Sequence, residues 1–270
     1  MEFNYNKNIF SITERMGKKR SIDITSQTDV LLNMELSFSD PESLLVKRPN
    51  NSIELNIPNY ILDLKQDEEI IFKKIHKSTR ADIRKAMEKD HLIYTEFENP
   101  NNVQIKKFHS LYNSFAREKK ISLCNLNKLL SLRDNDSLIM TSISDQKNNV
   151  LCTGMLLIDR ESKQLYGLYG VSNRLSKSTK EDKIKIGRAN KYWHWKEIQS
   201  AKKRGMDWYN FGGEVFQETG SGINDFKRRF GSICKYDRRV YIPKSLKGRV
   251  YVYLLYLKWK KCLKYDRLKS

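Results

Sequence analysis

The sequence predicts an α+β fold, in which a mixed, mainly antiparallel β-sheet is flanked by helices. Two observations lead to this prediction. After a short strand-rich N-terminal segment, helical segments are followed by a run of strands, and a further helix and strand lie beyond that run. Two of the central strands are joined by the short polar turn RESK, which is typical of an antiparallel meander. The chain is therefore expected to fold around one main sheet.

The N-terminal half begins with a strand-rich segment and continues with helices. Residues 1–62 are polar and include the alternating stretch SIELNI, so a short strand-rich extension is expected. Residues 67–89 have an interrupted apolar stripe that predicts helices, with Ser78 or Thr79 as the cap of the second one. The strand LIYTEFE follows. Residues 102–119 have apolar side chains at helical spacing and predict an amphipathic helix, which LNKLLSL is a candidate to continue.

The C-terminal half supplies the strands of the meander and a basic tail. The segments SLIMTSIS, VLCTGMLLID and KQLYGLYGV are expected to be consecutive strands. Residues 172–188 are expected to form a charged loop, residues 189–204 a helix ending at Gly205, and DWYNF the strand beyond it. The expected organisation is an N-terminal extension (1–62), a main domain (63–243) and a basic amphipathic tail (244–270).

The composition favours a polyanionic partner. The chain has 51 Lys and Arg against 32 Asp and Glu, a net charge of +19. Nucleic acid, an anionic membrane and phosphorylated substrates all fit this charge, and a merely solvated basic surface is the alternative. The four cysteines form no CxxC pair, so we expect reduced thiols and no metal site. No run approaches the ~20 apolar residues of a membrane span, and residues 1–20 lack a signal-peptide core, so a cytoplasmic location is expected.

One stretch has a specific pattern of glycine, aromatic and lysine residues. The strand WYN leads into Phe211-Gly212-Gly213, and Gly222, Phe226-Lys227 and Phe230-Gly231 follow. This order resembles the FemAB-like branch of the GNAT N-acyltransferases, in which a helix, a strand ending in FGG and a G…FK..FG segment occur in that order. A second stretch, STRADIRKAMEKDHLIY, is similar to the family's R..IRKA helix, although Asp90-His91 replaces its glycine. The resemblance covers about residues 65–242.

The resemblance implies a GNAT-like fold and the transfer of an acyl or aminoacyl group to an amine of a cell-envelope sugar or peptidoglycan precursor. Lys227 would neutralise charge on the attacked carbonyl oxygen, together with backbone amides near residues 169–171. The glycine pair would let the sheet open beside the acyl donor. The predicted catalytic residues are Lys227 and Phe226, with Asp207 and Glu214 as candidate proton acceptors. The predicted substrate contacts near this stretch are Trp208, Tyr209 and Phe230.

The expected donor is acyl-CoA, with aminoacyl-tRNA as the alternative. Acyl-CoA-using GNAT enzymes hold the pyrophosphate with main-chain amides at a helix N-terminus, within an Arg/Gln-x-x-Gly-x-Gly/Ala motif. The closest match here is IKIGRA, in which Ile184 stands where Arg or Gln is expected, and this departure leaves room for aminoacyl-tRNA. The predicted donor-binding residues are Tyr169, Gly170, Val171, Lys185, Gly187, Arg188, Ala189, Gly212 and Gly213.

Two basic segments are candidate binding surfaces. Lys77, Arg80 and Arg84 share one face of a predicted helix and could hold the phosphates of a nucleotide-sugar or lipid-pyrophosphate acceptor, although such a stripe is often only solvated. Residues 244–270 interleave basic and aromatic side chains, which fits docking on an anionic membrane, RNA binding or capping of the core. A non-catalytic GNAT-like module that binds RNA or an anionic membrane is the alternative function. His194, between two tryptophans, is expected to be a packed histidine rather than a general base.

Overall fold

The structure of the protein is a computed structural model that describes residues 1–17, 27–36, 51–173, 179–214 and 221–266. The described chain combines mainly antiparallel strands with flanking helices, which confirms the predicted α+β class. It forms two compact units. Unit 1 contains residues 1–59, 213–222 and 234–270, and unit 2 contains residues 60–212 and 223–233. The expected domain boundaries at residues 62 and 243 stay a prediction.

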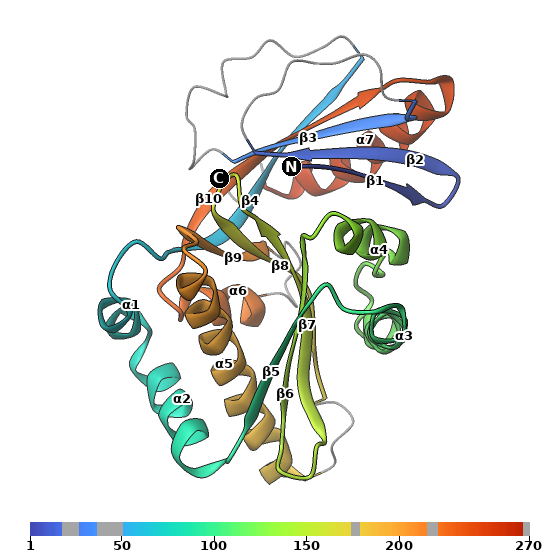
Figure 1. Ribbon diagram of the computed structural model, residues 1–270. Coiled ribbons are helices and arrows are strands. Elements are labelled where there is room, and N and C mark those ends of the chain that lie inside the picture. The colour runs from blue at the N-terminus through green and yellow to red at the C-terminus, as the bar shows by residue number, and fades with distance from the viewer. Residues whose placement is uncertain (18–26, 37–50, 174–178, 215–220, 267–270) are drawn as a thin grey trace. The chain divides into compact units, whose positions relative to one another are not determined.

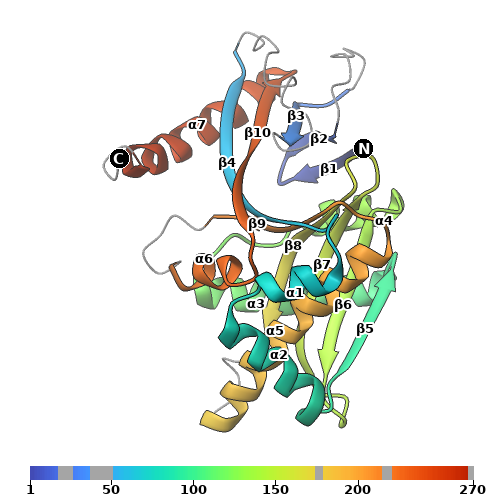
Figure 2. The same cartoon turned by 90° about the vertical axis from the view of Figure 1, so that its left-hand side faces the viewer.

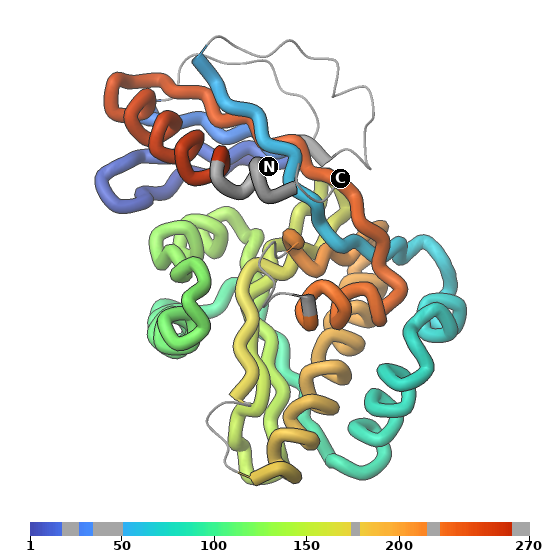
Figure 3. The backbone as a smooth tube through the Cα atoms, turned by 180° about the vertical axis from the view of Figure 1, so that it is seen from behind, coloured from blue at the N-terminus to red at the C-terminus, as the bar shows by residue number. Residues whose placement is uncertain are grey.

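Unit 1 is built on strands from both ends of the chain. Its strands lie in the order β1-β2-β3-β10-β4, so that the late strand β10 is inserted beside the early strand β4 (Figure 3). The pairs β1–β2 and β3–β10 are antiparallel, whereas β2 and β3 are parallel. The last residues of β4 belong to unit 2. The bounds are β1 (Glu2–Lys7), β2 (Phe10–Met16), β3 (Val30–Leu36), β4 (Ile53–Asp63) and β10 (Ile233–Pro243).

The basic tail of unit 1 forms helix α7 (Leu246–Asp266), which contacts β2 and β3 (Figure 2). Val252 is buried there, and the ring of Tyr251 lies 5.1 Å from that of Phe10. The helix starts against the main chain of Asp29, because a Cβ on Gly248 would lie only 1.9 Å from the Asp29 carbonyl oxygen. A glycine is therefore required at the point where α7 approaches the strands.

Unit 2 contains the predicted meander. Its strands lie in the order β4-β9-β8-β7-β6-β5; the pairs from β5 to β8 are antiparallel, and β8–β9 is parallel. Helix α5 covers one face with α2 outside it, and α3 and α4 lie on the other face (Figure 1). The bounds are α1 (Glu68–Lys74), α2 (Lys77–Lys89), β5 (Ile93–Glu98), α3 (Asn102–Lys119), α4 (Leu126–Asp134), β6 (Leu138–Ser144), β7 (Val150–Asp159), β8 (Gln164–Ser172), α5 (Lys180–Lys203), β9 (Trp208–Gly213) and α6 (Ser221–Arg228).

The core of unit 2 lies between the sheet and α5. Apolar side chains from α1, α2, α5 and the strands form one cluster, and the largest fully buried members include Tyr209, Phe230, Ile71 and Ile83. Trp193 of α5 reaches the sheet at Gly154, where only a glycine leaves room for its ring. Burial of this apolar surface is the main source of stability, and it fixes which face of α5 meets the strands.

Local sequence signals placed some helix boundaries correctly and others wrongly. Helix α3 begins where it was predicted, because Asn101 and Gln104 form a reciprocal capping box. The N-cap of α2 is His76 rather than Ser78 or Thr79, since the His76 ring accepts from the backbone N–H of Ser78. Helix α5 begins at Lys180, capped by Thr179, so the expected charged loop at 172–188 is wrong for its second half.

Two glycine substitutions test how tightly α5 packs on the sheet. We expect Gly154→Ala to destabilise the protein by about 1–3 kcal/mol, since the new Cβ would lie 2.6 Å from the Trp193 ring and 2.8 Å from the Tyr169 carbonyl oxygen. The control is Gly187→Ala inside α5, where no atom lies within 4 Å of an added Cβ and a gain of about 0.5–1 kcal/mol is expected. Urea unfolding measures both changes, and an unaltered midpoint for Gly154→Ala would contradict this account of the packing.

Candidate functional site

The candidate site is centred on the end of β9, where Gly212 turns the chain. Gly212 has a φ of +82°, a conformation that side chains with a Cβ rarely adopt. A Cβ there would also lie 3.3 Å from the Gly167 carbonyl oxygen of β8. The backbone N–H of Gly212 donates to Asn210 Oδ1 at 2.8 Å, which holds the turn. Glycine is therefore required at position 212 by both conformation and space.

The pairing between β8 and β9 covers only the beginning of both strands. Gln164 to Tyr166 pair with Trp208 to Asn210, and the described register ends there. Immediately afterwards β8 has an irregularity: Gly167 pairs with Leu156 and Tyr169 with Met155, so that Leu168 is an extra residue on β8. Alternate backbone amides of the following stretch, which includes Gly170 and Val171, point away from β7. They are candidates to donate to a bound carbonyl oxygen.

Lys227 lies directly beside the glycine turn and is nearly buried. Its side chain comes from α6, and only 8% of the residue is exposed. Its Nζ donates to the Gly212 carbonyl oxygen at 3.2 Å and lies 5.7 Å from the centre of the Tyr60 ring. A buried ammonium group is costly unless it is paired, so its position next to an enforced turn favours a functional role over a solvated one.

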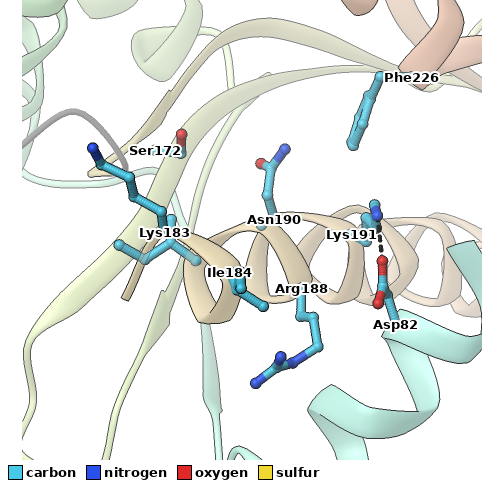
Figure 4. A pocket seen from close by; sticks show the side chains of 10 residues that line it. Asp82, Ser172, Lys183, Ile184, Arg188, Asn190, Lys191 and Phe226 are labelled. Carbon is cyan, nitrogen blue, oxygen red and sulfur yellow. Dashed lines mark hydrogen bonds and ion pairs between the residues drawn. The ribbon is translucent and has the colours of Figure 1, made fainter. Parts of the chain in front are cut away.

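A cavity of about 310 Å³ opens along the N-terminal half of α5 (Figure 4). This volume is at the lower end of the range for small-molecule sites. Two of its three basic side chains are neutralised, because Arg188 makes two 2.7 Å hydrogen bonds to Asp90 and Lys191 is paired with Asp82. Lys183 has no ion-pair partner in the part of the chain that the structure describes. The lining residues are Asp82, Ser172, Lys183, Ile184, Ile186, Gly187, Arg188, Asn190, Lys191 and Phe226.

The structure changes how the predicted donor motif would act. Gly187 is the eighth residue of α5, so its amide and that of Ala189 bond within the helix instead of lying free at its N-terminus. Ala189 is buried, and Lys185 does not line the cavity. Arg188 extends toward α2, away from Asn190 (Figure 4). Any contact of this segment with a donor would therefore come from side chains and not from an amide cradle.

Several predicted catalytic and substrate-binding residues are not brought to the cavity. Tyr209 and Phe230 are completely buried in the core, so neither can touch a substrate directly. Asp207 directly precedes β9 and Trp208 is its first residue; Asp207 is five positions before Gly212, which is roughly 16 Å along an extended strand. Asp207 is too far away to accept a proton beside Lys227. Gly213 and Glu214 belong to unit 1, in which the backbone N–H of Glu214 donates to the Pro58 carbonyl oxygen.

The predicted acceptor residues lie on a different face of α2. At 100° per residue, Lys77, Arg80 and Arg84 are on the side of the helix opposite to Asp82, which lines the cavity. Arg80 donates to the Lys73 carbonyl oxygen, and the Arg84 guanidinium lies 5.5 Å from the centre of the Phe72 ring. The structure therefore separates this basic face from the cavity on α5.

A buried polar network that the sequence analysis missed lies beside the site. Glu197 of α5 is completely buried, and its carboxylate accepts from Thr141 of β6 and from the Tyr209 hydroxyl, both at 2.6 Å. His194 Nδ1 lies 3.0 Å from the same carboxylate, and Trp193 Nε1 donates to Thr141 Oγ1 at 2.9 Å. The sequence did contain a signal for this network. Glu197 follows His194 by three residues in a tryptophan-rich helix, and a charged side chain on such an apolar face is rarely buried without a partner.

Burial raises the pKa values of a tyrosine and two cysteines of unit 2. Burial and the neighbouring Glu197 carboxylate raise the pKa of Tyr209 well above its usual value. Burial also raises the pKa of the Cys124 thiol to about 12 and that of Cys152 further still, so neither is a thiolate at neutral pH. These two buried cysteines are therefore poor nucleophiles.

Tyr209→Phe tests the network. Loss of the hydroxyl removes one donor to the buried Glu197 carboxylate, so we expect a loss of about 1–3 kcal/mol in the free energy of unfolding. Tyr253→Phe is the control, because Tyr253 is 60% exposed and its substitution should leave stability within about 0.5 kcal/mol of wild type. The comparison is made by urea unfolding at neutral pH; equal stability of Tyr209→Phe and wild type would mean that the hydroxyl is not needed by the carboxylate.

Comparison with known proteins places the fold. No family model matches the chain, and no curated protein matches its sequence. Among solved structures, FemX matches with a TM-score of 0.56 and 10% identity over 87% of this chain and 83% of FemX. A conserved protein of unknown function from Bacteroides thetaiotaomicron VPI-5482 matches with a TM-score of 0.50 and 10% identity, over 90% of this chain and 82% of that one. At these identities the likeness concerns the fold, and it confirms the predicted FemAB-like GNAT fold.

Proposed function

We propose that the protein is a FemAB-like N-acyltransferase that moves an acyl or aminoacyl group onto an amine of a cell-envelope sugar or peptidoglycan precursor. The observation that carries the proposal is the nearly buried Lys227, bonded to the carbonyl of the enforced Gly212 turn. An ammonium held in a water-poor site stabilises negative charge on an attacked carbonyl oxygen more strongly than it would in water. Direct attack by the amine needs no covalent enzyme intermediate, in keeping with the buried thiols.

The donor is acyl-CoA in this proposal, with aminoacyl-tRNA as the alternative. Lys183, Ser172 and Asn190 line the cavity and offer one cation and two neutral polar groups to a phosphate or to the polar arm of a donor. Alternate amides among Tyr169, Gly170 and Val171 would face the donor carbonyl where β8 leaves β9. Ile184, which stands where Arg or Gln is expected, and the position of Gly187 inside α5 are the two observations that keep aminoacyl-tRNA as the alternative donor.

The acceptor is an amine that carries phosphate or a lipid pyrophosphate. Lys77 is exposed at the first turn of α2, and Arg229 Nη1 lies 3.4 Å from Ser78 Oγ at the same end of the helix. No acidic side chain lies in the first turn of α2, so its positive end and the neighbouring cations would attract a phosphate group. Arg80 and Arg84 extend this basic face.

Helix α7 supports docking on an anionic membrane rather than on RNA. Leu246, Val250, Tyr253, Leu254 and Leu257 recur at helical spacing and are all exposed, from 77% for Leu246 to 40% for Leu257. Lysines and an arginine flank this stripe, so that apolar and basic groups are combined as in helices that lie in a bilayer interface. None of the described helices is long and apolar enough to cross a membrane. A non-catalytic GNAT-like module that binds RNA or an anionic membrane surface is the competing function.

Lys227→Met tests the catalytic proposal. We expect acyl transfer to fall by at least about 100-fold, because the charge that stabilises the oxyanion is lost. Stability should change by no more than about 1.5 kcal/mol, since a single hydrogen bond to a carbonyl is removed. Turnover is measured with acetyl-CoA, longer acyl-CoAs and aminoacyl-tRNA against an amino-sugar nucleotide. Lys203→Met, at the exposed end of α5, is the control. A parallel loss of folding and activity in Lys227→Met would indicate a structural lysine.

The double substitution Leu254→Glu and Leu257→Glu tests α7. We expect at least about tenfold weaker binding to phosphatidylcholine vesicles that contain phosphatidylglycerol, because two apolar contacts are replaced by repulsive charges. Ile9→Glu is the control, since Ile9 is exposed in unit 1 but lies outside the stripe. Vesicle co-sedimentation measures the effect. Salt-sensitive binding of the protein to single-stranded RNA, without binding to these vesicles, would favour the RNA-binding alternative.

A further inference from the structure

His194 continues the face of α5 that lines the cavity. Lys183, Gly187, Asn190 and His194 are separated by four, three and four residues, which places them in one stripe along the helix. The first three line the cavity. His194 is the next residue of the same stripe, and its ring lies 5.3 Å from that of Phe226, which lines the cavity as well. His194 itself does not line the cavity, but it lies one turn beyond Asn190 on the same stripe of α5 and contacts the ring of Phe226, which does.

The hydrogen bonds around His194 determine which ring nitrogen carries the proton. The Tyr209 hydroxyl donates to Glu197 Oε2, so its oxygen can only accept from His194 Nδ1, which lies 2.9 Å away. The Glu197 carboxylate, 3.0 Å from the same nitrogen, is also an acceptor. With two acceptors on that side, the neutral ring must be protonated at Nδ1. Its Nε2 then carries the free lone pair and has no partner among the described residues.

The surroundings of the ring suit a proton acceptor. The rings of Phe211, Phe226 and Phe230 lie 5.3 to 6.0 Å from that of His194 and shield it from bulk water. The side chain is nevertheless 19% exposed. The titratable groups that face it are Glu197 and Tyr209. Lys227 follows Phe226 on α6, and its Nζ is bonded to the Gly212 carbonyl oxygen, one residue after Phe211. A buried carboxylate behind Nδ1 stabilises the imidazolium that forms when Nε2 takes up a proton.

We propose that His194 is the general base of the transfer, positioned by Glu197 and Tyr209. The amine nitrogen attacks the donor carbonyl carbon and forms the new C–N bond, while the carbonyl electron pair moves to the oxygen beside Lys227. His194 Nε2 takes the proton that the nitrogen loses. The C–S bond of a thioester donor, or the C–O bond of an aminoacyl ester, then breaks, and the leaving sulfur or oxygen receives that proton. The assignment rests on the proposed acyltransferase function.

The first test measures the tautomer without any substrate. In the full-length protein labelled with ¹⁵N-histidine, long-range ¹H–¹⁵N correlation should show His194 protonated at Nδ1 with Nε2 unprotonated. The signal is assigned by its loss in His194→Gln. Glu197→Gln should weaken the preference for this tautomer, because the amide can turn its NH₂ group toward the ring. A neutral His194 protonated at Nε2 in wild type would overturn the assignment even if the enzyme is active.

The second test uses whichever donor supports turnover. His194→Gln should lower kcat by about 100-fold or more, leave KM for the donor within about threefold, and recover part of the rate as rising pH supplies hydroxide. Glu197→Gln should show a smaller loss of kcat in the same direction. His109→Gln on α3 is the matched control and should behave like wild type. Full activity in His194→Gln would overturn the role of His194 alone, whereas no turnover of any donor by wild type would overturn the proposed function and this assignment with it.

Discussion

The buried carboxylate of Glu197 connects three elements of unit 2. Thr141 from β6, Tyr209 from β9 and His194 from α5 itself all face it, and Trp193 completes the network through Thr141. An isolated charge in this position would be strongly destabilising, so helix and sheet can pack only in the arrangement that satisfies it. The orientation of α5 that brings Glu197 to the sheet also turns Lys183, Gly187 and Asn190 toward the cavity. Folding and the candidate site therefore depend on one set of contacts.

The glycine turn and the buried lysine form the second constraint. Gly212 is held by its conformation and by the close Gly167 carbonyl, and its own carbonyl receives Lys227. The short β8–β9 ladder and the bulge at Leu168 leave the backbone of β8 irregular at this level. These constraints place Lys227 beside the Gly212 turn, and they are the features on which the proposed acyltransferase function rests.

Local patterns predicted much of the fold. The apolar spacing of residues 102–119 predicted α3, the turn RESK joins β7 to β8 as expected, and the apolar spacing of the tail matches helix α7. The motifs Phe211-Gly212-Gly213 and Phe226-Lys227 meet in the structure, where Lys227 Nζ donates to the Gly212 carbonyl oxygen, and their role in a site stays a prediction. Two other predictions were wrong. The N-cap of α2 is His76, although serine and threonine are more common in that role. The polar residues at the start of α5 were predicted to be a loop but are helical.

The sequence by itself determined the fold class, the meander and the basic character of α7, because these follow from short-range periodicity, turn chemistry and charge. Only the tertiary structure decided which polar residues meet. Thr141 and Glu197 are 56 positions apart, and their contact depends on strand register and on the rotation of α5. The same packing buried Tyr209 and Phe230 and placed His194 Nδ1 beside the Tyr209 hydroxyl and the Glu197 carboxylate. Such side-chain pairings arise from long-range packing, which no local pattern specifies.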